Sequence, residues 1–140
     1  MATSYLVWAF VALVSYTMVS PLVSYVSADV PVDVVTLVTN GMLAVAVFGL
    51  VLYQGQEVAP YLTHPKAPYM YLAGVLLTVG IITYYRALSL GPVSVVVPIF
   101  GMFLVGSSVV GILFLSESLT PRKAAGIGFA ALAVYLTTVE

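Results

Sequence analysis

The chain has 140 residues, of which 62% are hydrophobic and only 6% are charged, and its formal net charge is −1. An average soluble domain carries roughly a quarter charged residues, so this chain has too few polar groups to cover a soluble fold. The near-neutral charge offers no basic surface for nucleic acid, and the absence of cysteine excludes disulfides and thiolate metal sites. The composition therefore predicts an integral membrane protein, whose first partner is the lipid bilayer.

Long apolar runs follow one another along the chain, and a membrane-spanning helix needs about 20 such residues. In chain order, the runs predict membrane helices over about residues 5–26, 34–53, 69–90, 93–115 and 121–139. A polar loop from Gln54 to Pro68 separates the second run from the third. The runs are too long for membrane strands, which need about 9–11 residues. We therefore predict an all-α fold, a polytopic bundle of about five transmembrane helices in which residues 1–140 form one domain.

The basic residues indicate an orientation in the membrane. Lys66, Arg122 and Lys123 fall on the side of the N-terminus, whereas Arg86 falls near the opposite side. By the positive-inside rule, we predict a cell-membrane protein with a cytoplasmic N-terminus and an outside C-terminus. The bias is three basic residues against one, so insertion in both orientations stays open as an alternative.

Arg86 is the one charge clearly within a predicted span, five residues before Gly91. It lies about 7–8 Å from the expected helix end, at 1.5 Å rise per residue. Arginine at a span centre costs about 2.5–3.5 kcal/mol on the insertion scale, and less near an end. One hypothesis is a cavity-facing cation that attracts an anionic or carbonyl-bearing substrate group. The alternative is that the side chain reaches to the interface or fixes the adjacent turn.

Three further polar side chains within the spans are candidates for a substrate cavity. Tyr84 and Tyr85 precede Arg86 and would line a permeation path or, alternatively, belong to the aromatic belt at the membrane interface. Asn40 lies in the middle of the second span, with Thr36 one turn earlier. Its amide must find a partner, either across helices or in a wet cavity, so helix packing is the alternative to a substrate role.

The fourth span carries a face of small and polar residues at helical spacing. This face comprises Ser94, Pro98, Gly101, Val105 and Ser108, at intervals of four, three, four and three. Pro98 frees a backbone carbonyl, and the small neighbours make room for close packing or for a ligand. We take Ser94, Pro98 and Ser108 as further cavity candidates.

Charged residues cluster in sequence where the fourth span is expected to end. Glu117 is close to Arg122 and Lys123, which predicts an interfacial ion pair, with a coupling carboxylate as the alternative. No Asp or Glu falls inside a predicted span, so a proton-coupled antiporter built on a buried carboxylate lacks its titrating group. No paired acids, Ser/His pair or metal-ligand cluster is visible in the spans, so we expect neither an enzyme nor a bound metal or cofactor.

Several motifs in the second half of the chain are similar to those of one transporter family. They are Tyr84-Tyr85-Arg86-Ala87-Leu88, Gly91-Pro92-Val93-Ser94, Pro98-Ile99, and Gly111-Ile112-Leu113-Phe114-Leu115-Ser116-Glu117-Ser118-Leu119-Thr120. Together they resemble the EamA domain of the drug/metabolite transporter superfamily, with its G-x-x-x-L-x-E-x-L-T helix–loop–helix. The resemblance is specific from Tyr84 to Leu136 and rests mainly on span pattern before that.

The resemblance implies a transporter of a small metabolite or drug-like solute. Members of this family typically carry two five-helix units, and this chain is similar to one, so the resemblance implies pairing as a homodimer or with a related half-size subunit. An inverted pair would require one chain in both orientations, which is in tension with the charge bias. The small multidrug resistance branch has a membrane glutamate in its first helix, and this chain has none there. A non-transporting assembly subunit and a lipid-carrier flippase component are the alternatives.

Overall fold

The computed structural model describes residues 4–114 and 118–138, and every regular element in these ranges is helical. The chain divides into two compact units, Met1–Leu90 and Gly91–Glu140. The first unit contains α1 (Ser4–Val26), α2 (Val32–Tyr53), the short α3 (Ala59–Leu62) and α4 (Ala67–Leu90). The second contains α5 (Val93–Gly101), α6 (Phe103–Phe114) and α7 (Pro121–Thr138). The all-α membrane-bundle prediction is confirmed.

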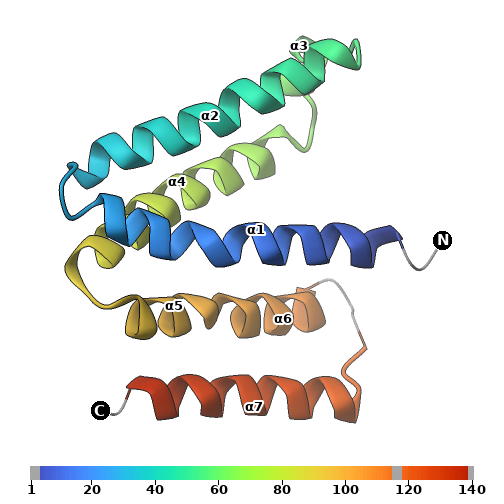
Figure 1. The fold of residues 1–140 in the computed structure, drawn as a ribbon. Coiled ribbons are helices and arrows are strands. Elements are labelled where there is room, and N and C mark those ends of the chain that lie inside the picture. Colours follow the sequence, from blue (N-terminus) through green and yellow to red (C-terminus); the bar gives the residue numbers. More distant parts are fainter. Residues whose placement is uncertain (1–3, 115–117, 139–140) are drawn as a thin grey trace. The chain divides into compact units, whose positions relative to one another are not determined.

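In the first unit, α4 packs against both α1 and α2 (Figure 1). The end of α1, the beginning of α2 and the end of α4 meet at one end of this unit. The buried apolar side chains there include one from each of the three helices: Val23, Val35 and Leu88, of which Leu88 is only 2% exposed. The most deeply buried apolar side chains of this unit therefore lie at the end that also carries Asp33 and Arg86.

Helix α2 starts two residues before its predicted span and ends at Tyr53, as predicted. It begins at Val32, so that Asp33 falls in its first turn rather than in the preceding loop. It ends at a Schellman motif, in which the Gln56 amide donates to the Val51 carbonyl and the Gly55 amide to the Leu52 carbonyl, each at 3.1 Å. Gly55 has φ +63°, the left-handed conformation that this motif requires and that glycine adopts without steric cost.

The loop predicted from Gln54 to Pro68 contains one unpredicted element, the single-turn helix α3. Helix α4 then begins at Ala67, two residues before the predicted start of the third span. Tyr71 on α4 donates a hydrogen bond of 2.8 Å from its hydroxyl to the Leu62 carbonyl at the end of α3. This contact fastens the loop to the beginning of α4.

The fourth span is interrupted once. Helix α5 contains Pro98 and ends at Gly101, and α6 starts after Met102. The Met102 amide donates to the Ile99 carbonyl at 3.1 Å, a tightened i to i−3 bond, and regular bonding resumes with Gly106 donating to Met102. Proline, which removes a backbone donor, and glycine, a weak helix former, account for the interruption. In the second unit, α7 packs against both α5 and α6.

Among the described residues, four segments are helical, long and apolar enough to cross a membrane: Tyr5–Val26, Val32–Tyr53, Ala67–Leu90 and Val93–Phe114. The predicted fifth span forms a helix, α7, but falls outside this set. Its first turn, Pro121-Arg122-Lys123, lowers its mean hydropathy. Most apolar side chains on the four spans are exposed, which is the expected state of helices whose surroundings are lipid tails or another membrane protein. The prediction that the whole chain forms a single domain stays a prediction.

Candidate functional site

Arg86 forms an ion pair with Asp33 at the end of the first unit. The guanidinium Nη2 lies 3.4 Å from the Asp33 Oδ1, which joins the end of α4 to the first turn of α2. The two side chains remain 59% and 73% exposed, so the pair lies open rather than enclosed in the bundle. An acid in a first helical turn is also favoured by the helix dipole. Arg86 therefore has a structural partner, and it keeps further N–H donors that this contact leaves available.

Asp33 is a carboxylate within a membrane span, although the sequence predicted none there. The residue was interpreted as a boundary of the second span, whereas the structure places it inside α2, one residue from the helix start. Asp33 is 73% exposed and lies at the helix end, so it is not a carboxylate buried in the span. The expectation of no carboxylate thus holds for the middle of the described spans but is wrong for this helix end.

Ser20 and Tyr84 form the polar contact buried deepest in this unit. The Ser20 Oγ on α1 and the Tyr84 hydroxyl on α4 are 2.6 Å apart, and both residues are buried. Most other Ser and Thr hydroxyls within the described spans donate to carbonyls of their own helix, as Thr17 does to Leu13 and Thr78 to Gly74. Ser20 instead bonds across helices, so this contact fixes the register of α1 against α4.

Tyr85 is the more deeply buried of the two neighbouring tyrosines. It is 4% exposed, and its ring centroid lies 6.2 Å from that of Tyr84 with the planes tilted by 54°. An interfacial belt residue would be exposed to the headgroup region. The burial of both rings therefore favours a role inside the protein over the belt interpretation.

Asn40 finds its partner within its own helix. Its Nδ2 donates to the Thr36 carbonyl at 2.9 Å and lies 3.4 Å from the Thr39 hydroxyl. The described residues give the amide nitrogen a partner on α2 itself, and the contact across helices or to a wet cavity stays a prediction. Asp33, Thr36 and Asn40 are spaced three and four apart, so they share one face of α2 that runs about 10 Å inward from the ion pair. This polar stripe begins at Arg86 and continues toward the middle of α2.

The candidates of the fourth span belong to the second unit. Ser94 is exposed near the start of α5, and Pro98 is half-buried in the same helix. Ser108 lies on α6, where its hydroxyl donates to the Leu104 carbonyl at 2.8 Å. The hydroxyl of Ser108 is therefore already engaged inside its own helix.

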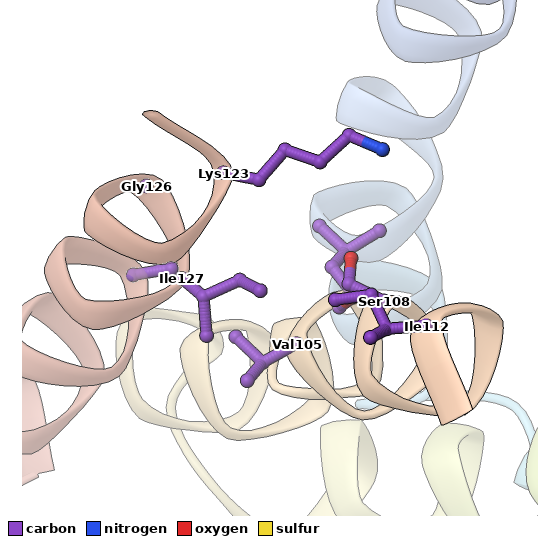
Figure 2. A pocket seen from close by; sticks show the side chains of 8 residues that line it. Val105, Ser108, Ile112, Lys123, Gly126 and Ile127 are labelled. Carbon is purple, nitrogen blue, oxygen red and sulfur yellow. The ribbon is translucent and has the colours of Figure 1, made fainter. Parts of the chain in front are cut away.

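A groove of about 300 Å³ opens between α6 and α7. We call it the α6–α7 groove; its lining includes Val105, Ser108 and Ile112 from α6 and Lys123, Gly126 and Ile127 from α7. In Figure 2, Val105 and Ile127 point toward each other from the two helices, and the Lys123 side chain extends away from α7 above the apolar side chains. Its lining is apolar apart from Ser108 and Lys123.

The predicted ion pair around Glu117 is only partly described. Glu117 itself lies outside the described residues. Arg122 and Lys123 lie exposed in the first turn of α7, and the Lys123 amide donates to the Thr120 Oγ1 at 3.3 Å, which caps the helix. The pairing of these cations with Glu117 stays a prediction.

The structure places the Tyr84 and Tyr85 rings side by side and pairs Arg86 with α2 instead, and it adds two residues that sequence reasoning missed. Ser20 and Asp33 are separated from their partners by 64 and 53 positions. Asp33 could have been found from its spacing to Thr36 and Asn40, which places the three on one helical face. Nothing in the sequence around Ser20 predicts its contact. Within residues 4–114 and 118–138, no three His, Asp or Glu side chains gather in a way that could hold a metal ion.

Comparison with known proteins gives one match. The model of the EamA-like transporter family matches residues 3–139, which is nearly the whole chain and corresponds to one EamA unit. No curated protein and no solved structure matches the chain significantly.

Proposed function

The chain belongs to the EamA-like transporter family, a family of multi-pass membrane transporters rather than enzymes, and from this premise we propose that it carries a small metabolite or drug-like solute across a cell membrane. The observation that carries the proposal is the match of the family model to residues 3–139 as a single unit. The family assignment implies a bilayer and a solute as partners. The identity of the solute is left to experiment.

The chain is proposed to act together with a second five-helix unit, either another copy or a related subunit. One observation supports this pairing: the matched region amounts to one EamA unit. In transporters built from repeats, the substrate site lies at the interface between two repeat units. The proposed orientation, from the basic residues, has the N-terminus in the cytoplasm.

The solute is proposed to meet the polar stripe of α2 and the neighbouring end of α4. Arg86 would contact an anionic or carbonyl-bearing group, because its guanidinium is exposed and Asp33 engages it through one contact of 3.4 Å. Asn40 would contact a polar group further along the stripe through its amide oxygen, since its nitrogen is bonded to the Thr36 carbonyl. Tyr85 is the third candidate; its ring is only 4% exposed, so it would meet a solute only after the surrounding helices part.

The remaining candidates have weaker support as solute contacts. The Tyr84 hydroxyl bonds to Ser20 and the Ser108 hydroxyl to Leu104, so both would have to give up a hydrogen bond to meet a solute. Ser94 has an exposed hydroxyl and Pro98 frees a backbone carbonyl, but both belong to the second unit, and they stay candidates.

Exchange in proteoliposomes tests the proposal. Vesicles holding the purified chain are loaded with a mixture of amino acids, nucleosides, sugars and organic anions, and loss of each is followed by mass spectrometry. We expect protein-dependent loss of one chemical class, reduced at least tenfold in Arg86→Gln and unchanged in Lys66→Gln, which removes a cation from the loop instead. Full retention of every class by the unmodified chain would count against transport. Unimpaired exchange by Arg86→Gln would remove Arg86 from the path.

A further inference from the structure

We propose that His64 makes the turn before α4 sensitive to pH: the turn is closed when the imidazole is neutral and opens when the ring is protonated. The Lys66 amide donates a hydrogen bond to the His64 Nδ1 at 3.1 Å, and the Ala67 amide donates to the His64 carbonyl at 2.7 Å. Helix α4 begins at Ala67. We call residues 64–67 the His64 turn, because His64 accepts both of these bonds.

Two prolines make the His64 turn depend on these contacts. Pro65 lies inside the turn and Pro68 follows it, and proline has no backbone N–H. The Lys66 and Ala67 amides are therefore the backbone donors beside the start of α4, and His64 accepts from both. Without the imidazole as acceptor, the Lys66 amide is left to water.

Protonation of His64 removes this acceptor. A neutral imidazole accepts at one ring nitrogen and donates at the other, whereas both nitrogens of the protonated ring are donors. The bond from Lys66 to Nδ1 therefore requires the neutral ring with its proton on Nε2. Histidine is the side-chain type whose charge ordinarily changes between about pH 5 and pH 8. The bond is thus present toward the upper end of this range and is lost as the pH falls.

The charges near His64 act in the same direction. A cation before the first turn of α4 is disfavoured by the helix dipole, and Lys66 already places one positive charge there. His64 lines a hollow of about 340 Å³ whose other titratable side chain is Tyr71, and the Tyr71 hydroxyl donates to the Leu62 carbonyl at 2.8 Å. None of the described residues that line this hollow carries a carboxylate that would stabilise the protonated ring.

Opening of the His64 turn loosens the loop that joins α2 to α4. The loop then stays attached to α4 through the hydrogen bond from Tyr71 to Leu62. In the proposed orientation this loop faces the cytoplasm, so the turn responds to acidification on that side. The proposal concerns the order of the loop and is independent of solute transport.

Nuclear magnetic resonance of the purified full chain in micelles tests the hydrogen bond. The chain contains two lysines, Lys66 and Lys123, so labelling lysine with nitrogen-15 gives two backbone amide signals. We expect the Lys66 amide proton to shift toward the position of an unbonded amide as the pH falls from about 8 to about 5. The Lys123 amide, which donates to the Thr120 Oγ1, is the internal control and should keep its position.

A spin label measures the opening of the loop. Thr63→Cys introduces a single thiol beside the His64 turn, and Tyr53→Cys introduces one at the exposed end of α2 as the control. On acidification we expect the ratio of mobile to ordered label at Thr63→Cys to rise about fivefold, the factor that corresponds to one hydrogen bond of about 1 kcal/mol. The label at Tyr53→Cys should not respond.

Three variants at exposed positions identify the titrating group. His64→Asn keeps an acceptor oxygen in the place of Nδ1 but does not titrate, so the loop should stay ordered at both pH values. His64→Ala has no acceptor, so the loop should be open at both. Glu57→Gln removes a carboxylate of the same loop and should leave the pH response unchanged.

Three results would overturn the proposal. A Lys66 amide signal that stays in place on acidification would show that the bond does not depend on the charge of the ring. An equal pH response in His64→Asn, or its loss in Glu57→Gln, would assign the titration to another group. A titrating Lys66 amide together with constant mobility of the label at Thr63→Cys would show that the bond does not hold the loop.

Discussion

The Ser20 Oγ on α1 and the Tyr84 hydroxyl on α4 lie 2.6 Å apart and are buried, although 64 positions separate the two residues. One turn away, the Leu88 side chain is almost completely buried on the same helix. On the other side of α4, Arg86 reaches Asp33 of α2. Two residues of α4 thus bind its neighbours, Tyr84 to α1 and Arg86 to α2, and the buried Tyr85 lies between them in the sequence. The proposed solute contacts rest on this arrangement.

The hydrogen bond between Ser20 and Tyr84 should be measurable as a coupling energy. Tyr84→Phe is expected to lower the free energy of unfolding by about 1 kcal/mol, since interhelical hydrogen bonds in membrane proteins average about 0.6 and reach about 1.7 kcal/mol. The measurement is a double-mutant cycle with Ser20→Ala. The free energy of unfolding of each variant is obtained by titration with sodium dodecyl sulfate in mixed micelles. Tyr53→Phe, at an exposed tyrosine, is the matched control and should have no effect. A coupling energy of zero would mean that the bond does not form in the membrane.

The ion pair between Arg86 and Asp33 allows structure and solute binding to be separated. Both side chains are largely exposed, so Arg86→Gln should change the free energy of unfolding by less than about 1 kcal/mol. The doubly reversed variant Asp33→Arg/Arg86→Asp restores an ion pair but moves the cation from α4 to α2. We expect it to recover stability and to remain at least tenfold slower in exchange.

A matched control for that experiment is Asp29→Asn, which removes a neighbouring carboxylate for which the described structure gives no contact with Arg86. It should exchange solute like the unmodified chain. Recovery of exchange in the reversed double variant would show that the ion pair, and not the position of the cation, is what transport requires.

Asn40 should matter for transport and little for stability. Because its amide nitrogen bonds to the Thr36 carbonyl of the same helix, no described interhelical contact is lost in Asn40→Leu. The free energy of unfolding should stay within about 0.5 kcal/mol of the unmodified value, while the exchange rate falls several-fold. Asn40→Gln, which keeps an amide on the same face, should retain part of the rate. A loss of stability above about 2 kcal/mol would identify Asn40 as a packing residue instead.

The orientation of the chain can be read from cysteines placed at the two ends of α2. The chain contains no cysteine, so Ala28→Cys and Gln56→Cys each introduce a single reactive thiol. With a cytoplasmic N-terminus, an impermeant maleimide should label Ala28→Cys from outside the cell, and Gln56→Cys only after the membrane is opened. Labelling of half of each variant from outside would demonstrate dual insertion and would favour an antiparallel pair.

Much of the fold was predictable because a bilayer imposes a simple rule on sequence: each crossing needs about 20 apolar residues. Hence four long spans and a C-terminal helix were predicted close to where they lie. Local breaks were harder, because the interruption at Met102 and the single turn of α3 depend on backbone bonding over a few residues. The first turn of α2 was missed for a similar reason, since Pro31 and Asp33 were interpreted as loop residues although both suit a helix start.

The sequence allowed the residues of the candidate site to be predicted, but not the residues that they contact. Arg86 and Asn40 stand out in sequence because polar groups are costly in a span. Their partners depend on the register between helices, which periodicity does not determine. Asp33 is 53 positions from Arg86, and Ser20 resembles any other serine in an apolar run. The Asn40 nitrogen bonds to its own helix, a partner that was not considered from the sequence, because such bonding competes with contacts to neighbours.

The central claim, that this EamA unit transports solute only together with a second unit, is tested most directly on single vesicles. Chains labelled with one fluorophore at Gln56→Cys are reconstituted at low density, photobleaching steps count the chains in each vesicle, and exchange of the identified solute is recorded for the same vesicle. We expect vesicles with one chain to be silent and those with two to exchange solute. Exchange by single-chain vesicles, at the rate per chain found in two-chain vesicles, would contradict the claim.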